Sequence, residues 1–283
     1  MKPLAKRARV RAARLGLVLL LVVGNPPTPP AVVLWAWDRP EDLRFLDPRR
    51  VAVASLAGTL RLRADGLEVR AREHPLVVPT GTALVPVVRI ETDPMVTTAL
   101  LAERRIEAAE AILALAGGAT TRHVQLDFDA TLRERAFYRA LLADLRARLP
   151  RDATLSITAL ASWCFGDRWL DDLPVDFAVP MLFRMGPDAE AIRQALAAGR
   201  DFRSPLCRHG AGVALDEPIP RLPPGRSLYV FAPRPWSDVE YRDVAVLTGG
   251  KCRGADRPLP GGPGAGLGVV PSGGPFLVVV EAE

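Results

Sequence analysis

Short apolar runs alternate with longer amphipathic segments along the chain from residue 31 onwards. This alternation is typical of strand–helix–strand units, in which parallel strands are buried between helices and are apolar on both faces. The second run should continue into a hairpin, because Asp65 and Gly66 follow it and form a common turn sequence. We expect eight strands, at residues 31–37, 50–63, 83–92, 123–129, 154–160, 176–183, 211–217 and 227–233.

Apolar residues at helical spacing predict four helices, at residues 94–115, 132–149, 187–199 and 237–247. Eight strands in succession, in a chain of 283 residues, suit a (β/α)8 barrel of the TIM type, which typically has about 250 residues. We therefore predict an α/β fold with such a barrel over residues 31–248. The alternative is a doubly wound open sheet.

The N-terminal 30 residues differ from this central part. Six Lys and Arg residues precede an apolar run at 15–23, which ends at a Gly-Asn-Pro-Pro sequence. These features predict a secretory signal, with a basic amphipathic or disordered segment as the alternative. Because about 20 apolar residues are needed to cross a bilayer, we expect no integral membrane span.

The C-terminal segment 249–283 is rich in Gly and Pro and predicts a short disordered tail; its last apolar run, 276–280, is too short for a membrane anchor. Much of the formal charge of +5 lies in the N-terminal segment, so a nucleic-acid partner is not expected. The chain is predicted to be periplasmic or secreted, and membrane-associated if its N-terminal segment is not cleaved.

Cysteine and histidine provide no metal or cofactor motif. The three cysteines lack metal-ligand spacing, and their odd number leaves at least one unpaired. A bridge between Cys164 and Cys207 is possible, although unpaired thiols are favoured. Since the three histidines are scattered, we expect no cofactor and no metal, and a hard cation at the aspartates is a minor alternative.

Polar side chains gather at the carboxyl ends of the predicted strands, where the active sites of parallel α/β folds lie. Gln125, Asp127 and Asp129 share one face of their strand, because strand side chains alternate. Leu126 and Phe128 share the other face. If Phe128 packs against the helices, both aspartates point into the barrel mouth.

Two carboxylates on opposite sides of a mouth suit glycoside hydrolysis, which needs an acid and a second carboxylate as base or nucleophile. Asp127 and Asp129 could supply one side, and Glu217 the other; these three are the predicted catalytic residues. Strand-end tryptophans suit the apolar faces of sugars, and polar groups suit hydroxyls or acidic sugars. The predicted substrate-binding residues are Trp37, Glu91, Trp163, Arg184, Asp216, Arg234 and Trp236.

Other catalytic motifs are absent from the sequence. It contains no GxSxG, no HExxH and no P-loop, and no GxGxxG stands between a strand and a helix. The chain therefore lacks the usual sequence signs of a serine hydrolase, a zinc protease or a nucleotide-binding protein.

Five segments together carry a resemblance: VQLDFDAT, SITALASW, VDFAVPMLFRMG, VALDEP and YVFAPRPW, in this order along the chain. Over residues 31–247 the chain resembles an uncharacterised bacterial family of unknown function whose members look like glycosidase-type TIM barrels. The resemblance implies a barrel fold but assigns no reaction.

The LDFDA segment also looks like the acidic strand signature D-x-D-x-E of chitinase-like glycosidases. Asp127 and Asp129 match its aspartates, whereas Thr131 stands where the catalytic glutamate is required. Glu134 lies one helical turn later and is not expected to reach that point. The mechanism of that group is therefore not carried over.

The sequence as a whole predicts a carbohydrate-active protein of the cell envelope, most simply a glycoside hydrolase acting on a poly- or oligosaccharide. Two alternatives remain: a catalytically silent barrel that binds polysaccharide, and a plain envelope scaffold. Measuring turnover and binding separately distinguishes these three functions.

Overall fold

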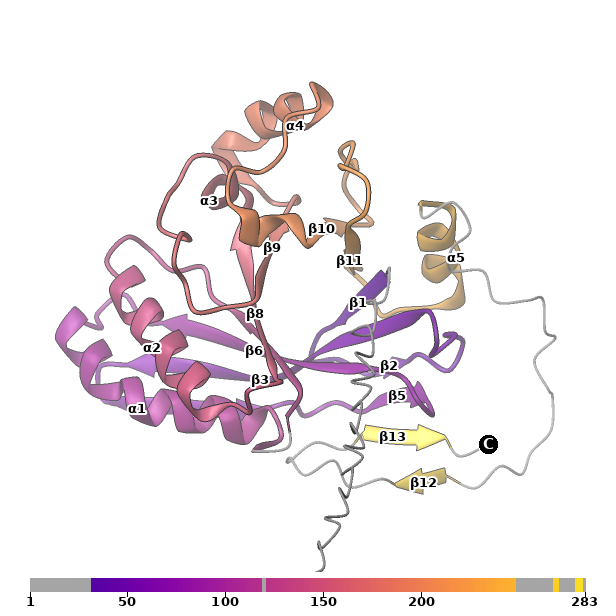
Figure 1. Cartoon of the computed structure of the whole chain (residues 1–283). Coiled ribbons are helices and arrows are strands. Elements are labelled where there is room, and N and C mark those ends of the chain that lie inside the picture. Colours follow the sequence, from indigo (N-terminus) through magenta and orange to yellow (C-terminus); the bar gives the residue numbers. More distant parts are fainter. Residues whose placement is uncertain (1–31, 119–120, 248–266, 270–277, 282–283) are drawn as a thin grey trace, which may run out of the picture.

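The computed structural model describes residues 32–118, 121–247, 267–269 and 278–281, and its centre is a closed barrel of eight parallel strands (Figure 1). The first strand, β1, pairs with both β3 and the last barrel strand, β11, which closes the ring. The closed ring confirms the predicted barrel rather than an open sheet. Its strands are β1 (Val32–Ala36), β3 (Val51–Arg63), β6 (Leu84–Thr92), β7 (His123–Asp127), β8 (Thr154–Leu160), β9 (Phe177–Met181), β10 (Gly210–Ala214) and β11 (Ser227–Phe231).

Helices follow five of the eight strands. They are α1 (Thr98–Leu115), α2 (Arg135–Arg148), the short α3 (Ala161–Phe165), α4 (Ala189–Ala197) and α5 (Asp238–Leu247), with 3-10 turns at η2 (Gly186–Asp188) and η3 (Pro205–Arg208). Figure 1 shows α1 and α2 side by side along the β3–β6 part of the wall. Helix α1 begins later than predicted because the Thr97 side chain caps it by accepting from the Leu100 amide.

Alternation along each strand divides the core into an outer and an inner part. On β1, Val32 and Leu34 face the outer layer, whereas Val33 and Trp35 face the barrel interior. The interior has room for Trp35 because Gly212 of β10 lies opposite; a Cβ there would stand 2.7 Å from the indole ring. A small residue on one strand therefore accommodates a large one on another.

The predicted hairpin is present. Strand β4 (Gly66–Ala71) runs antiparallel to the second half of β3, beyond a register shift between Leu56 and Gly58. The carbonyl of Arg70 would lie 2.5 Å from a Cβ at Gly58, so the two strands approach closely only because this residue has no side chain.

A second, four-stranded sheet was not predicted. It contains β2 (Glu41–Asp42), β5 (Leu76–Pro79), β12 (Leu267–Val269) and β13 (Val278–Glu281). Strand β13 pairs in parallel with β5, an ordered element that was not predicted within a tail expected to be disordered or weakly ordered. A Val-rich run has high strand propensity, and β5 offers it an edge. The predicted signal at 1–30 and the other tail residues lie outside the described part of the chain.

Cys164 in α3 and Cys207 in η3 are fully buried and form a disulfide, with 5.9 Å between their Cα atoms. The expectation that the thiols are unpaired is thereby corrected. The amides of Arg203 and Ser204 donate to the Cys164 carbonyl and bring the two segments together. This approach is tertiary and leaves no trace in the cysteine spacing. Cys252 lies outside the described residues.

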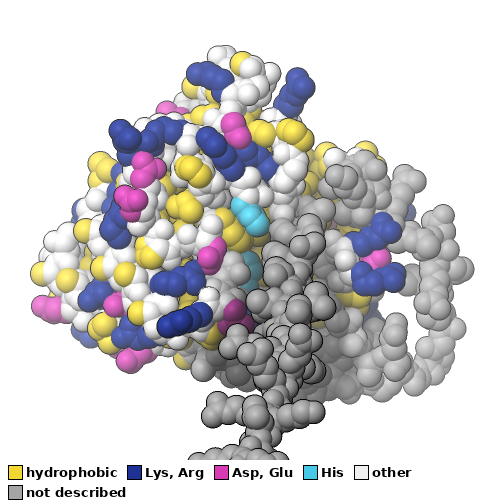
Figure 2. Space-filling view, in the orientation of Figure 1, with side chains coloured by type: hydrophobic (Ala, Val, Ile, Leu, Met, Phe, Trp, Pro, Cys, Tyr) yellow, Lys and Arg dark blue, Asp and Glu magenta, His cyan; other side chains and the backbone are white. Residues whose placement is uncertain are grey.

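The described surface carries both charges. Figure 2 shows that positive and negative side chains are interspersed over the described part of this face, with no large area in which all charges have the same sign. Among the described helices, none has the length and apolar character that a membrane crossing requires.

Candidate functional site at the barrel mouth

Strand β7 presents Asp127 to the barrel interior. Leu126 and Phe128 belong to the outer core, and the Phe128 ring packs edge-on against Tyr138 of α2, with 5.1 Å between ring centroids. Asp127 is only 4% exposed and accepts hydrogen bonds from Thr158 Oγ1 at 2.7 Å and Arg89 Nη1 at 2.8 Å. A buried carboxylate is thus compensated by two donors on the neighbouring strands.

Asp129 lies in the loop directly after β7 and is exposed to solvent. Within the described part of the chain, it makes no hydrogen bond or ion pair. Partial burial and the neighbouring charge of Asp127 raise the pKa of Asp129 above its ordinary value, while Arg89 acts in the opposite direction. Asp129 is therefore an available carboxyl group with an increased tendency to hold a proton.

Arg89 and Glu91 on β6 extend the polar network outwards. Arg89 donates from Nε to Glu91 Oε1 at 3.1 Å, and its guanidinium lies 5.9 Å from the Trp37 ring centroid. Hydrogen bonds from Arg61 lower the pKa of Glu91; burial opposes this effect and Arg89 adds to it. Glu91 therefore acts as a fixed anion that positions two arginines.

Trp37, Phe183 and Phe231 form an aromatic platform at the ends of β1, β9 and β11. Phe183 and Phe231 are stacked, with centroids 5.6 Å apart and planes at 3°, and Trp37 meets Phe231 edge-on at 6.3 Å. All three are half-buried, so part of each ring remains accessible. Arg184 lies over Phe231 at 5.3 Å.

Glu217 contacts Arg184, which lies over the platform, and is extensively bonded. The Arg184 amide donates to both of its carboxylate oxygens, at 3.1 and 3.3 Å, while the guanidinium groups of Arg184 and Arg193 lie at 3.5 and 3.6 Å. Arg184 also binds Asp216 at 2.9 Å and has a left-handed backbone, with φ of 50°. Neither Asp127 nor Asp129 shares a hydrogen bond or ion pair with Glu217.

Two predicted tryptophans lie in the core rather than at the mouth. Trp163 is 4% exposed and packs edge-on against Trp169, because α3 follows β8 directly and directs this side chain to the outer layer. Trp236 is also 4% exposed, and its Nε1 donates to the Trp35 carbonyl at 2.8 Å. Arg234 is exposed, and its carbonyl accepts a hydrogen bond from Arg39.

Glu134, the nearest glutamate after Asp129, is buried and serves the loop itself. It accepts hydrogen bonds from the Thr131 amide and hydroxyl and from the Thr92 hydroxyl. Burial alone would raise the pKa of Glu134, but these bonds outweigh it and hold the pKa below its ordinary value. Glu134 therefore ties the loop after β7 to the end of β6.

Sequence reasoning missed Thr158, Phe183, Phe231 and Arg61 as members of this site. Phe183 and Phe231 could have been found, since each lies two residues after an inward-facing residue of its strand. In the described residues, no three His, Cys, Asp or Glu side chains meet as a metal site requires.

Comparisons of the chain with protein-family models, characterised proteins and solved structures return no match. The resemblance to glycosidase-type barrels therefore stays a prediction.

Proposed function

We propose that the barrel mouth binds carbohydrate and that the protein is a glycoside hydrolase in which Asp129 is the proton donor. The observation that carries this proposal is the pairing of a free Asp129, whose pKa is raised, with a buried Asp127 anchored by Arg89 and Thr158. A general acid must hold its proton near the working pH, and a nearby negative charge favours this.

In the proposed reaction, the Asp129 carboxyl proton moves to the glycosidic oxygen as the bond from that oxygen to the anomeric carbon breaks. Water adds to the anomeric carbon, and the proton that this water loses returns to the Asp129 carboxylate and restores the acid. The aromatic platform supplies flat apolar faces that suit the C–H faces of a sugar ring beside the acid. Arg184 and Asp216 at the end of the platform offer a donor and an acceptor to hydroxyl groups.

A sugar-binding barrel without turnover is the second candidate, and one observation favours it. Hydrolysis requires a second working carboxylate, yet Glu217 is bonded to Arg184 and Arg193 and Glu91 to Arg61 and Arg89. To complete the catalytic pair, Glu217 would have to work while bonded to Arg184 and Arg193 or exchange these partners for substrate. Otherwise it is a positioning residue that holds Arg184 on the platform.

We further propose that the protein acts in the periplasm or outside the cell. The buried Cys164–Cys207 disulfide supports this location, because such bonds persist mainly in oxidising compartments. The N-terminal basic and apolar pattern points the same way. Fractionation of cells that express the full chain, with thiol labelling of each fraction, tests the location.

The test of function is a screen of the full chain against acidic and neutral bacterial exopolysaccharides, with binding and release of reducing ends measured separately. Asp129→Asn should lower turnover by about 100-fold or more and leave binding nearly unchanged. Trp37→Ala should weaken binding by about tenfold. Asp152→Asn, which changes an exposed residue paired with Arg122, is the matched control.

Three outcomes separate the candidates. Turnover that depends on Asp129 supports the hydrolase. Binding that depends on Trp37, without turnover in the wild type, supports the silent sugar-binding barrel. The absence of binding to every polysaccharide, or turnover unchanged by Asp129→Asn, contradicts the hydrolase.

A further inference from the structure

The hairpin of β3 and β4 continues the barrel wall beyond the end of the ring, and its two faces differ. Leu60 and Leu62 on one face are fully buried against the outer core, which includes α1. Thr59 and Arg61 alternate with these leucines and therefore belong to the opposite face. That face carries polar side chains from β4, β3 and β6.

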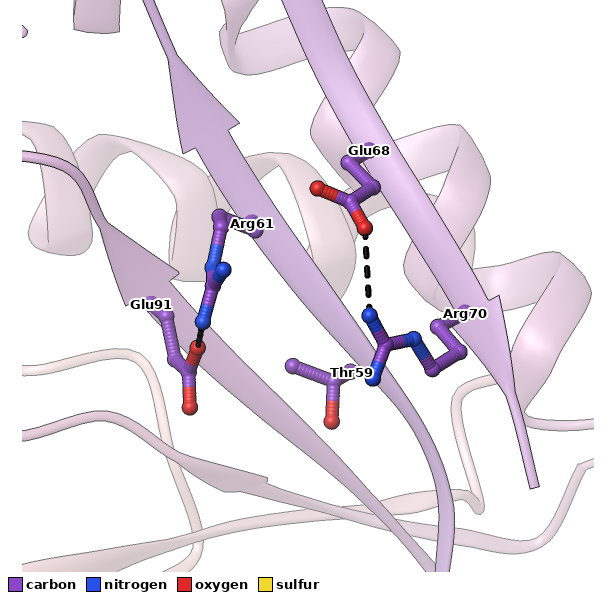
Figure 3. A pocket seen from close by; sticks show the side chains of 5 residues that line it. All are labelled: Thr59, Arg61, Glu68, Arg70 and Glu91. Atoms are coloured by element: carbon purple, nitrogen blue, oxygen red, sulfur yellow. Dashed lines mark hydrogen bonds and ion pairs between the residues drawn. The ribbon is translucent and has the colours of Figure 1, made fainter. Parts of the chain in front are cut away.

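Strand register arranges these side chains in two cross-strand rows. One row is Arg70, Thr59 and Arg89, and the next is Glu68, Arg61 and Glu91. Thr59 is the one short side chain at the centre of these rows, flanked by long ones. The result is an open hollow of about 120 Å³, lined by Thr59, Arg61, Glu68, Arg70 and Glu91 (Figure 3).

The carboxylates of the hollow are already engaged. Glu91 accepts from Arg61 and Arg89, and Glu68 accepts from Arg63 and Arg70. Each acidic side chain therefore has two guanidinium partners.

The donors of the hollow are not all used. The Thr59 hydroxyl, Nη1 of Arg61, and Nε and Nη1 of Arg70 have no acceptor among the described residues. Among the described residues the Arg70 side chain makes one hydrogen bond, at 3.3 Å, and this side chain is 63% exposed. A hollow with spare donors and occupied carboxylates suits a ligand that brings acceptor oxygens, above all an anionic group.

The hollow is joined to the mouth through Glu91. Arg61 binds one oxygen of Glu91 at 2.6 Å, Arg89 binds the other at 3.1 Å, and Arg89 also binds Asp127. One unbroken chain of ion pairs therefore connects the hollow to the candidate acidic site.

We infer that the Thr59 hollow is a subsite for an anionic sugar, one bearing a carboxylate or sulfate group, next to the barrel mouth. The inference rests on the proposed function, which supplies the carbohydrate chain at the mouth, and it names the substrate as an acidic glycan. Arg70 and Thr59 bind the anionic group, and Arg61 contributes its free Nη1.

The test uses amide NMR of the full chain titrated with methyl galacturonate, galactose 6-sulfate, methyl galactoside and inorganic sulfate. Either acidic sugar should shift the signals of Thr59, Arg61 and Arg70, and should bind more tightly than the neutral sugar or free sulfate. Arg70→Gln and Thr59→Val should each weaken this binding by about threefold to fivefold, and added salt should weaken it too.

Arg104→Gln is the matched control, because Arg104 bonds Glu107 at the same 3.3 Å on α1, behind the sheet. Equal shifts with the neutral methyl galactoside, equal binding of inorganic sulfate, or no shift at the hairpin would overturn the inference. If polysaccharide binds through Trp37 but the hairpin signals do not shift, the result contradicts the Thr59 subsite alone. Hairpin binding without any polysaccharide at the mouth contradicts the proposed function instead.

Discussion

The carboxylate of Asp127 lies 2.8 Å from Nη1 of Arg89, and this ion pair joins the barrel interior to its mouth. Asp127 is 4% exposed at its side chain, whereas Arg89 is 39% exposed. The buried anion therefore depends on a partly solvated cation for compensation. It also acts on Asp129, since its charge helps to raise the pKa of that residue.

Removing this charge should change the proton affinity of Asp129. In Asp127→Asn, the pKa of Asp129 should fall, because one cause of its elevation is lost while partial burial remains. Carboxyl carbon chemical shifts measured across pH report this directly. Any activity that requires protonated Asp129 should then disappear at lower pH than in the wild type. An unchanged titration of Asp129 would contradict the coupling.

Gly212→Ala should destabilise the barrel by about 1–3 kcal/mol, because the added methyl group would stand 2.7 Å from the Trp35 ring inside the barrel. Urea denaturation measures the loss. Gly166→Ala is the control, since its nearest atom would be 3.8 Å away. In a double variant with Trp35→Phe, the cost of Gly212→Ala should shrink; an equal cost in both backgrounds would argue against the clash.

The titration of His123 should make the stability of the protein depend on pH. Burial lowers its pKa to about 4; Asp176 opposes and His209 adds to this effect. Between pH 6.5 and 4, His123 binds a proton in the unfolded chain but remains neutral in the folded chain. The free energy of unfolding therefore decreases as the pH falls through this range. The difference between the ordinary pKa of 6.5 and the folded pKa of about 4 corresponds to a loss of about 3 kcal/mol in the free energy of unfolding.

His123→Gln should flatten this part of the stability curve, because glutamine does not titrate. Ser156 Oγ, which lies 2.8 Å from His123 Nε2, can still bond the amide. The difference in unfolding free energy between wild type and variant, measured from pH 7 to 4, isolates this histidine from carboxylates common to both. Parallel curves would show that another group is responsible.

The disulfide should contribute about 2–4 kcal/mol, since it closes a long loop between positions separated by 43 residues. Reductant should therefore lower the urea midpoint of the wild type. The Cys164→Ala, Cys207→Ala double variant should already have the lower midpoint and should not respond. A similar response to reductant in both proteins would mean that the bridge is not the cause.

The barrel could be predicted because local patterns encode it. Each of its eight strands is an apolar run, and the turn at Asp65 and Gly66 has its own signature. Strand β2 has two residues and β5 four, too few to show a period. Their sheet is held by pairing with distant segments, which sequence spacing does not reveal.

The candidate site was predictable in part for the same reason. Alternation alone brings Asp127 to the inner face of its strand. The positions of Trp163 and Trp236 depend on the direction in which the chain turns after a strand and on one hydrogen bond to Trp35. Such tertiary contacts decide whether a strand-end tryptophan faces a ligand or the core.

The pairing of β1 with both β3 and β11 also determines the order in which the molecule can assemble. A chain synthesised from its N-terminus presents one side of β1 without a partner until residues 227–231 are complete. An unpaired strand edge is prone to join other chains. The chain is therefore most prone to aggregate with its own copies in the interval before β11 has been synthesised.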